Sequence, residues 1–423
     1  MTSAPAAALA HPAAPDASAG PALPDRRALP ADADADAGPG AWPIGTDSFF
    51  QPRRAAFWLL VLLLANGGVY IAQLYWIGLR AVPVTALLGL AVWALYTAAF
   101  VYLFRVLELL EQQPAAAFVL AFAWGGLGAV YLSAPANVAI QSLAAKLVSP
   151  DFVAVWGPAL AGPITEEFFK LAGVMLIVLV ARNQFPTELS VLVIGAMVGL
   201  GFQVVENLSY TVRAAISFPI ENQWLPVLLN LVTRGLLGGL WSHAAYTTVA
   251  SFGLACAMFQ TGRPRVLRIA MAVAGFAAAW AMHFAWNSPW LEDRFPDTRW
   301  GLAALLVVKG LPVALAAALV WRAALREEGR HLQALAAYLV PERELLSDDE
   351  WMRLGSPLER LRVRREIGRR HGRKARRLKA RLQREQLRLV MKAGVYGRGA
   401  RTERHELAIR RIRSRFDGLA VPA

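Results

Sequence analysis

The chain has 423 residues, of which 56% are hydrophobic, with a mean hydropathy of +0.40 and a formal net charge of +14 at pH 7. This apolar content exceeds that of an ordinary soluble domain, and several apolar runs reach the roughly 20 residues that span a bilayer. A single cysteine, Cys256, excludes an intramolecular disulfide framework and a cysteine-based zinc cluster. The composition predicts a multi-pass membrane protein.

Residues 1–52 are rich in Ala, Pro and Asp and predict a disordered leader. They lack the basic start and apolar core that are typical of a cleaved signal peptide. Arg53 and Arg54 follow directly, in front of the first apolar run. Arginines at that position favour a cytoplasmic N-terminus.

Apolar segments fill residues 53–322 and predict an all-α fold, a polytopic membrane helix bundle with about eight transmembrane helices. The fourth span is predicted to begin at Pro163, because proline suits the first helical turn, after a partly apolar lead-in over residues 151–162. The predicted spans cover residues 57–77, 82–104, 115–140, 163–180, 188–212, 235–259, 267–288 and 301–321.

The loop charges predict the orientation, because Lys and Arg accumulate in short cytoplasmic loops. With the N-terminus inside, the inner segments carry more of these residues, as in the loop with Arg263, Arg265 and Arg268, and the acidic segment around residue 293 lies outside. Eight spans then place both termini in the cytoplasm. We expect a protein of the cell inner membrane.

The basic tail, residues 323–423, accounts for the whole charge excess. From residue 322 onward the chain carries 27 Lys and Arg against 13 Asp and Glu. Residues 357–392 predict a basic helix that ends near Gly394 and Gly397. Each Lys or Arg near an anionic membrane adds about 1 kcal/mol of binding, which favours contact with anionic lipid. Nucleic-acid binding is less favoured, because no recognition motif accompanies the charge.

Three charged residues, Glu166, Glu167 and Lys170, lie inside the predicted fourth span. A charge inside the bilayer costs at least about 2.5 to 3.5 kcal/mol, so this group predicts a functional site. Glu166 and Lys170 are four residues apart, and a self-neutralising pair would explain them structurally. Glu167 points roughly 100° away around the helix and needs a polar cavity or a partner of its own.

The next three spans also carry polar groups. A structural reading is open for each, since amides and acids join helices by hydrogen bonds and single histidines are often satisfied core residues. Their depth favours a shared site: Glu166, Glu206, His243 and His283 lie 16, 18, 18 and 15 residues from the inner ends of their spans. The additional polar residues of these spans are Asn207, Thr247 and Asn287.

Such a site, in the outer half of the membrane, suits activation of a water molecule for amide hydrolysis. A glutamate can act as general base, a histidine can position the water or donate a proton, and an asparagine amide can stabilise an oxyanion. The same residue types also bind divalent ions such as Zn²⁺, although the sequence has no H-E-x-x-H helix. Both alternatives stay open from the residues alone.

Four motifs in this order resemble those of the PrsW family, which are bacterial intramembrane proteases related to CAAX prenyl endopeptidases. The motifs are Glu166-Glu167-x-x-Lys170, Gly201-Phe202-x-x-x-Glu206-Asn207, Ser242-His243 and His283-x-x-Trp286-Asn287. The resemblance covers residues 57–321. It implies cleavage of a membrane-anchored protein substrate, with first-site cleavage of an anti-sigma factor as the best-known role.

The resemblance also implies roles for individual residues. Glu166 and Glu167 are the implied catalytic pair, and Asn287 the implied oxyanion donor. Glu206, His243 and His283 complete the implied water-binding site, with Lys170 and Asn207 in support. The family has been described both as metallopeptidases and as glutamate-dependent enzymes. If a metal such as Zn²⁺ binds, its candidate ligands are Glu167, Glu206, His243 and His283.

Two other functions are compatible with buried carboxylates and histidines. A proton- or ion-coupled transporter would use them to carry charge, but such proteins often repeat their broken helices in both halves, and the first three spans carry no counterpart of these motifs. A membrane scaffold without catalysis would keep the same pocket.

Overall fold

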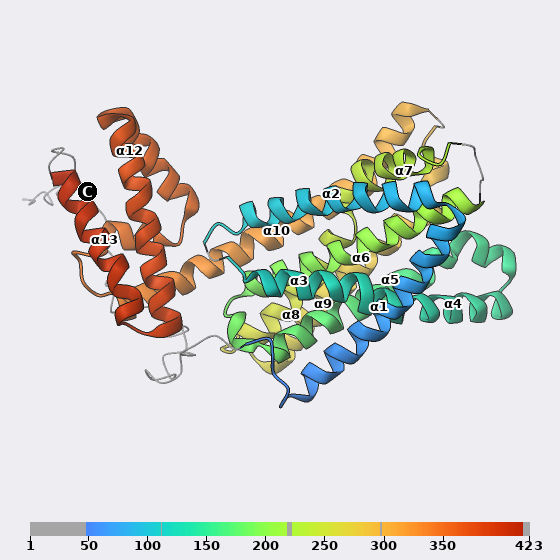
Figure 1. Ribbon diagram of the computed structural model, residues 1–423, viewed down its shortest axis with the longest axis horizontal. Coiled ribbons are helices and arrows are strands. Elements are labelled where there is room, and N and C mark those ends of the chain that lie inside the picture. The colour runs from blue at the N-terminus through green and yellow to red at the C-terminus, as the bar shows by residue number, and fades with distance from the viewer. Residues whose placement is uncertain (1–47, 111, 218–221, 297, 418–423) are drawn as a thin grey trace, which may run out of the picture.

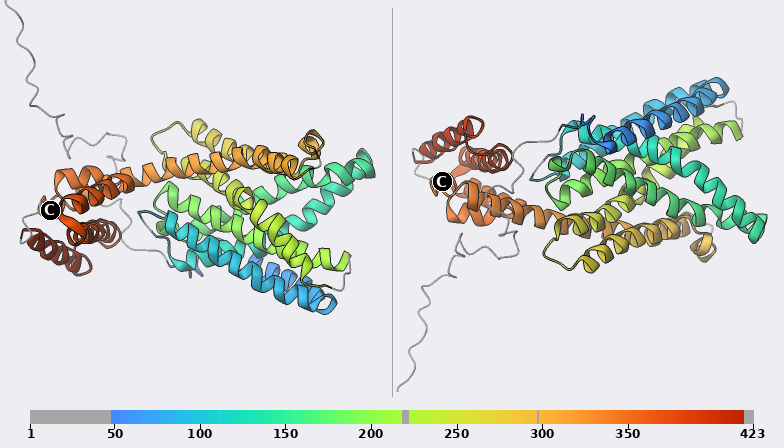
Figure 2. Two further views of the ribbon diagram at one scale, coloured as in Figure 1. Left: turned by 90° about the horizontal axis from the view of Figure 1, so that it is seen from above. Right: turned by 90° about the horizontal axis from the view of Figure 1, so that it is seen from below.

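The computed structural model describes residues 48–110, 112–217, 222–296 and 298–417. Within these ranges every regular element is helical, as the sequence predicts. Most of the predicted leader, residues 1–47, lies outside the described residues. The helices up to α10 form a long bundle, and a smaller helical unit lies at one end of it (Figures 1 and 2).

The longer helices are α1 (Ala55–Ala81), α2 (Pro83–Leu107), α3 (Ala115–Ala123), α4 (Val130–Leu147), α5 (Pro150–Val180), α6 (Glu188–Ser217), α8 (His243–Phe259), α9 (Arg265–Asn287), α10 (Arg299–Leu339), α12 (Pro357–Tyr396) and α13 (Ala400–Asp417). Two short helices are α7 (Leu225–Asn230) and α11 (Asp348–Leu354). A π-helical turn, η1 (Trp124–Ala129), joins α3 to α4, and the turns η3 (Leu231–Leu237) and η4 (Gly239–Trp241) lead into α8. Single helical turns, η2 (Arg182–Gln184) and η5 (Pro289–Arg294), follow α5 and α9.

Six of the described helices are long and apolar enough to cross a membrane, and a seventh span is present if the bent pair Leu225–Leu237 and Gly239–Phe259 counts as one. The chain is thus built as a multi-pass membrane protein. The predicted number of eight is not confirmed, because α5 does not belong to this set. α5 is the helix that carries Glu166, Glu167 and Lys170.

The predicted start of the fourth span at Pro163 is wrong, because α5 begins 13 residues earlier, at Pro150. The side chain of Ser149 caps this helix by accepting a hydrogen bond from the Phe152 amide, 3.1 Å away, and Pro150 takes the first helical position. A capping side chain followed by proline is a stronger start signal than an isolated proline. The predicted lead-in is therefore helical, and Pro163 lies inside α5.

α6 is the central helix of the bundle, and all its residues from Glu188 to Val204 are buried. Glycines let its neighbours approach closely. A Cβ atom on Gly199 would lie 2.3 Å from the backbone oxygen of His243, and one on Gly201 would lie 2.1 Å from that of Phe122. Small residues at helix contacts allow such approaches in membrane proteins. This packing sets the start of α8 directly against α6.

The predicted sixth span, residues 235–259, is broken rather than continuous. Its two parts are bent by 46°, and α8 begins at His243, after the break. Non-helical backbone at membrane depth is tolerated where it is buried in protein or lines a cavity. The break therefore places His243 at a helix start that faces the interior of the bundle.

The basic tail is a folded unit, whereas the sequence predicts a single basic helix. The predicted helix exists as α12, but Gly372, with a φ of 83°, divides it into two limbs. Figure 1 shows the limbs folded back on each other, and Gln383 of the second limb donates to the backbone oxygen of Arg360 in the first. Gly397, with a φ of 70°, ends the helix as predicted, while Gly394 lies within it.

This tail unit has a hydrophobic core of its own, to which the connection between α2 and α3 contributes Leu110. α10 runs without interruption through the predicted domain boundary at residue 322 and joins the core with its last turns. The division into domains at that residue stays a prediction. The core side chains include Leu332, Leu335, Leu345, Trp351, Leu382, Val390, Ile409, Ile412 and Phe416.

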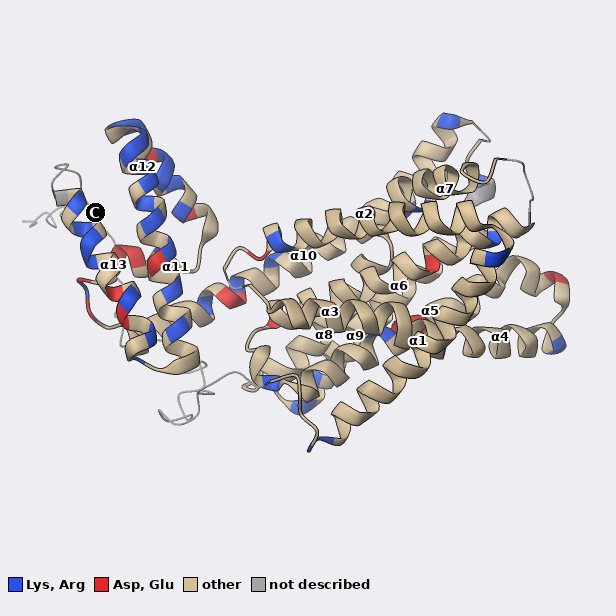
Figure 3. Ribbon diagram, in the orientation of Figure 1, with Lys and Arg blue, Asp and Glu red and all other residues tan. Residues whose placement is uncertain are grey.

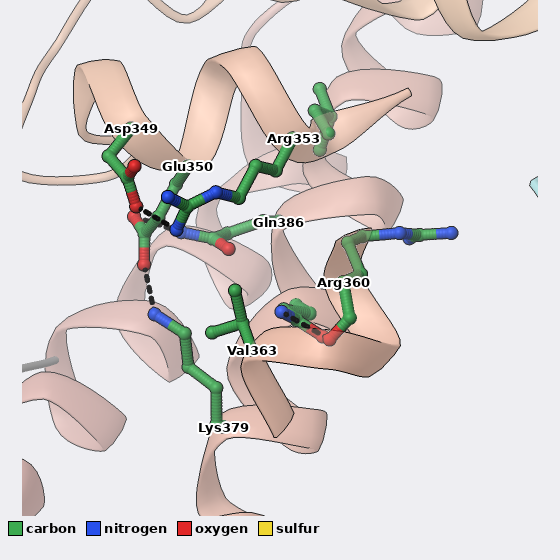
Figure 4. Close-up of a pocket in the computed structure, with 9 residues that line it drawn as sticks. Asp349, Glu350, Arg353, Arg360, Val363, Lys379 and Gln386 are labelled. Carbon is green, nitrogen blue, oxygen red and sulfur yellow. Dashed lines mark hydrogen bonds and ion pairs between the residues drawn. The ribbon is translucent and has the colours of Figure 1, made fainter. Parts of the chain in front are cut away.

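A buried carboxylate, Glu350, holds the helices of the tail unit together. Its oxygens accept from Lys379, 2.8 Å away, from Arg413, 2.5 Å away, and from Gln386, 2.8 Å away. Figure 4 shows Glu350, Lys379 and Gln386 around a small cavity of about 20 Å³. Burial alone would raise the pKa of Glu350, but the ion pairs with Lys379 and Arg413 outweigh it and lower this pKa from 4.5 to about 2.

We expect Glu350→Gln to loosen the tail unit, because the neutral amide loses two charged partners. A carboxyl whose pKa is lowered on folding stabilises the fold above its unfolded pKa, here on the order of 2 to 3 kcal/mol. This contribution is lost as the pH falls from about 4.5 toward 2. Amide hydrogen exchange over α11 to α13, corrected for intrinsic rates, should accelerate in the variant at pH 7 and in the unmodified protein at low pH.

The matched control is Asp349→Asn, because the ion pair of Asp349 with Arg353 is largely exposed. Exposed pairs contribute little, so exchange should stay unchanged in this variant. Equal effects of the two substitutions would contradict the role of Glu350.

Candidate functional site

A polar cavity of about 170 Å³ lies where the middle of α5, the C-terminal half of α6, the start of α8 and the end of α9 meet. It has room for several water molecules. Charged residues are otherwise sparse in the body of the bundle (Figure 3). The titratable residues that line the cavity are Glu166, Glu206, Tyr210, Arg234, His243, Tyr246 and His283.

Lys170 is fully buried beside this cavity, and its ammonium group joins two helices. Its Nζ donates to Oε1 of Glu167, 2.7 Å away, and to Nδ1 of His243, 2.8 Å away. The nearest oxygen of Glu166 is farther, at 3.7 Å. The self-neutralising pair considered for Glu166 and Lys170 is thus formed mainly by Glu167. A buried ammonium is tolerated here because carboxylate and imidazole acceptors surround it.

Glu166 keeps one oxygen without a hydrogen-bond partner. Its Oε1 accepts from Asn137, 3.2 Å away, but its buried Oε2 has no hydrogen bond within the described part of the chain. This oxygen lies 3.8 Å from Nδ1 of His243 and 3.9 Å from Nε2 of His283. An unsatisfied buried carboxylate oxygen needs a water molecule, an ion or a ligand. The cavity beside Glu166 supplies the space.

His283 presents one ring nitrogen to the same space. Its Nδ1 lies 3.0 Å from Oε1 of Glu167, and since a carboxylate only accepts, Nδ1 carries the hydrogen. Nε2 then has a free lone pair directed toward Glu166. Two hydrogen bonds of ordinary length can bridge the 3.9 Å between Nε2 and Oε2 through one water. The ring of Tyr246, stacked 5.0 Å from that of His283, fixes its orientation.

His243 has both ring nitrogens occupied. Because Lys170 donates to Nδ1, the hydrogen of the neutral ring lies on Nε2, which donates to Oε2 of Glu206, 3.0 Å away. His243 therefore links Glu206 on α6 to Lys170 on α5. Thr247, one turn farther along α8 as predicted, donates to Oε2 of Glu167, 3.2 Å away.

Arg234, on η3 just before the helix break, is a site residue that sequence reasoning missed. It donates to Glu206 Oε2, 2.7 Å away, and to Asn207 Oδ1, 2.8 Å away, and its guanidinium lies 3.9 Å from the ring centre of Tyr210. The predicted sixth span begins at residue 235, which left this arginine outside the membrane. An arginine next to a long apolar run was the available signal.

Two further contacts concern the end of α9. Asn287 donates to the backbone oxygen of Pro158, 3.3 Å away, and lines the cavity, so one of its two N–H groups stays available. Lys309, on α10, donates to the backbone oxygens of Trp286 and Ser288, both at 3.0 Å. This lysine, which sequence reasoning also missed, caps α9 and holds the turn that carries Asn287.

The structure brings all the predicted site residues into one region. Their catalytic roles stay a hypothesis, and so does the predicted metal ligand set. The side chains whose ligand atoms lie within 4.8 Å of one another are Glu166, His243 and His283. This group includes Glu166 in place of the predicted Glu167 and Glu206. The predicted residues in this region are Glu166, Glu167, Lys170, Glu206, Asn207, His243, His283 and Asn287.

The group of Glu166, His243 and His283 fits a divalent metal in its donor atoms. One carboxylate with two imidazoles is a known ligand set of catalytic zinc, and the unpaired oxygen of Glu166 and the free nitrogen of His283 face each other. The third donor, Nδ1 of His243, is shared with Lys170. The three residues could therefore hold a metal if Lys170 releases this nitrogen.

Comparison with known proteins identifies the region that contains the site. Residues 113–316 match the family model described as PrsW family intramembrane metalloprotease. The match extends from the residues before α3 into α10 and includes every site residue named above, whereas the tail unit lies beyond it. No curated protein and no solved structure matches the chain.

We expect Arg234→Gln to lower turnover of membrane-tethered peptides about 10- to 100-fold, the usual effect of removing a group that orients a site residue. Without the guanidinium, Glu206 loses its charged partner and no longer fixes the Nε2 side of His243. The loss should appear in kcat more than in KM, and Arg234→Lys should restore part of it. Single-site kinetics in detergent micelles can measure both.

Arg213→Gln serves as the control, because Arg213 is an exposed arginine of α6 outside the cavity lining. Unchanged kinetics in Arg234→Gln would contradict the positioning role, and so would an equal loss in both variants.

Proposed function

We propose that the PrsW-family domain of this chain, residues 113–316, hydrolyses a peptide bond of a membrane-anchored protein, with Glu166 as the principal base. The family supports intramembrane peptidase activity in general. The observation that carries the finer proposal is the buried, unpaired Oε2 of Glu166, which lies 3.9 Å from Nε2 of His283 beside the cavity.

The two acceptors define how a water molecule would be held. A water between Glu166 Oε2 and His283 Nε2 donates one hydrogen to each, because both atoms only accept in this arrangement. Its oxygen lone pairs then point away from both groups, toward the cavity where a substrate carbonyl would lie. Glu166 takes the proton as the water attacks, and later gives it to the leaving amine.

Glu167 is less suited to act as the base, because its oxygens are already engaged. Oε1 accepts from Lys170 and from His283, and Oε2 accepts from Thr247. We therefore assign Glu167 the task of orienting His283 and compensating the charge of Lys170. Asn287, with one N–H group free, is the candidate donor to the oxyanion.

The family description supports a metal-dependent reaction, and Glu166, His243 and His283 would hold the ion. A divalent ion such as Zn²⁺ supplies Lewis-acid activation of water when bound. The remaining contributions come from this chain: Lys170 and Glu206 hold His243, and Glu167 holds His283.

The substrate proposal is a membrane-anchored protein, and an anti-sigma factor is one candidate of this kind. We place the protein in the cell inner membrane with both termini in the cytoplasm. The basic loop between α8 and α9 and the basic tail lie at the same end of the structure, which supports one cytoplasmic side (Figure 3).

Glu166→Gln and His283→Asn should each lower turnover about 100- to 10,000-fold, because each removes one of the two groups that hold the water. Residues that act as a unit are not additive, so the double variant should lose little more than either single variant. Cleavage of a panel of membrane-tethered peptides measures turnover, and melting in detergent checks that the variants stay folded. Should Glu167→Gln abolish cleavage while Glu166→Gln does not, the assignment of the base is wrong.

Zinc titration of the purified protein tests the ligand set independently of activity. We expect one ion per chain, and an affinity about 10- to 100-fold weaker in Glu166→Gln and in His283→Asn. Glu206→Gln should weaken binding less, since Glu206 contacts Arg234 and His243 from outside the proposed set. A larger loss in Glu206→Gln than in Glu166→Gln would favour the ligand set predicted from the sequence.

The orientation can be tested by labelling cysteines placed at the two ends of α9, in a Cys256→Ser background. Arg265→Cys should react with an impermeant reagent only after the inner face is opened, whereas Arg294→Cys should react in intact cells, since the loop charges place residue 265 inside. The opposite labelling pattern would contradict the proposed topology.

A further inference from the structure

The tail unit has no role in the proposed reaction, and it lies outside the family match. Its most unusual surface belongs to the two limbs of α12. Residues 357–396 contain 15 Lys and Arg against three Asp and Glu, and the stretch 369–377 around the bend has six basic residues and no acidic one. Like charges at this density destabilise a folded unit unless something outside it compensates them.

Internal ion pairs neutralise only part of this charge. On the surface of α12, Arg362 pairs with Glu359, Arg370 with Glu366 and Arg388 with Glu385. Eight more exposed basic residues of the hairpin have no carboxylate partner in the part of the chain that the structure describes: Arg365, Arg369, Arg373, Lys374, Arg376, Arg377, Arg381 and Arg384.

The crowding is also visible inside the hairpin. Arg364 hydrogen-bonds to Gln383 between the limbs. Burial, followed by the neighbouring Arg384 and Arg376, lowers the pKa of Arg364. Positive charges thus meet from both limbs, and the hairpin surface is matched to a polyanion.

The hairpin is fixed close to one end of the transmembrane bundle. At the start of its first limb, Arg360 donates to the backbone oxygen of Leu109, 3.4 Å away, in the connection that follows α2. The next residue, Leu110, lies in the core of the tail unit. The last turns of α10 join the same core. Three segments therefore hold the hairpin near the membrane surface at which α2 ends.

We propose that the exposed basic residues of the α12 hairpin dock on anionic lipid headgroups of the leaflet next to the tail unit. A tethered surface meets this leaflet at high effective concentration, whereas a soluble polyanion has to be recruited. Among the larger apolar side chains of the hairpin, only Leu358 is strongly exposed, so the contact is electrostatic rather than insertion of a hydrophobic face. Docking therefore depends on salt and on lipid charge.

The experiment uses the full chain in lipid nanodiscs, with His371→Cys at the bend labelled by a fluorescent donor in a Cys256→Ser background. Energy transfer to acceptors on the lipid headgroups reports docking. We expect more transfer in discs with about a third phosphatidylglycerol than in discs of phosphatidylcholine alone, and loss of the difference at high salt.

Arg373→Gln with Arg377→Gln should lower the ratio of docked to undocked tails about 30-fold, since each charge near the surface contributes about 1 kcal/mol. The matched control is Arg411→Gln with Arg415→Gln, which removes two exposed charges of the same spacing from α13. This control should keep docking near that of the unmodified protein.

Three results would overturn the proposal. Transfer that does not depend on lipid charge excludes electrostatic docking, and an equal loss in both double variants shows that net charge alone matters. A rise in donor anisotropy when a short DNA duplex is added to phosphatidylcholine discs, without a response to phosphatidylglycerol, identifies nucleic acid as the partner. None of these outcomes depends on peptidase activity, so the tail proposal and the proposed function can fail separately.

Discussion

The ammonium group of Lys170 is the contact on which the arrangement of the site depends. It compensates Glu167, and by donating to Nδ1 of His243 it sets the hydrogen of that ring on the side of Glu206. Glu167, held in this way, fixes His283 with its free nitrogen toward the cavity. Glu166 is then the one carboxylate of the adjacent pair that keeps an oxygen without a partner. A neutral side chain at position 170 would leave these acids competing for the same imidazoles.

The backbone makes this contact possible through close packing and one helix break. Gly199 on α6 leaves no room for a side chain beside the oxygen of His243, so α8 begins directly against α6. The bend before His243 turns the start of α8 toward α5 and allows Arg234, on the other side of the break, to reach Glu206. A straight helix over the same residues would present these two side chains at different depths.

The cost of charge in a membrane explains which parts could be predicted from the sequence. Glu166, Glu206, His243 and His283 stand out from apolar surroundings, and their similar depth indicates one site. Asn137 is neutral, and the helix break leaves hydropathy almost unchanged, so neither gave such a signal. In the tail, a single glycine, Gly372, turns a basic helix into a hairpin, and sparse apolar residues concealed a core that only the tertiary contacts reveal.

The balance of formal charges around the cavity has a consequence for inhibitor design. Three carboxylates, those of Glu166, Glu167 and Glu206, face two permanent cations, Lys170 and Arg234, which leaves one negative charge without a counterpart. A small molecule that carries an amidine or a protonated amine next to a carbonyl mimic would match this excess and reach the unpaired oxygen of Glu166. A carboxylate at the same place would meet like charge in a medium that screens it poorly.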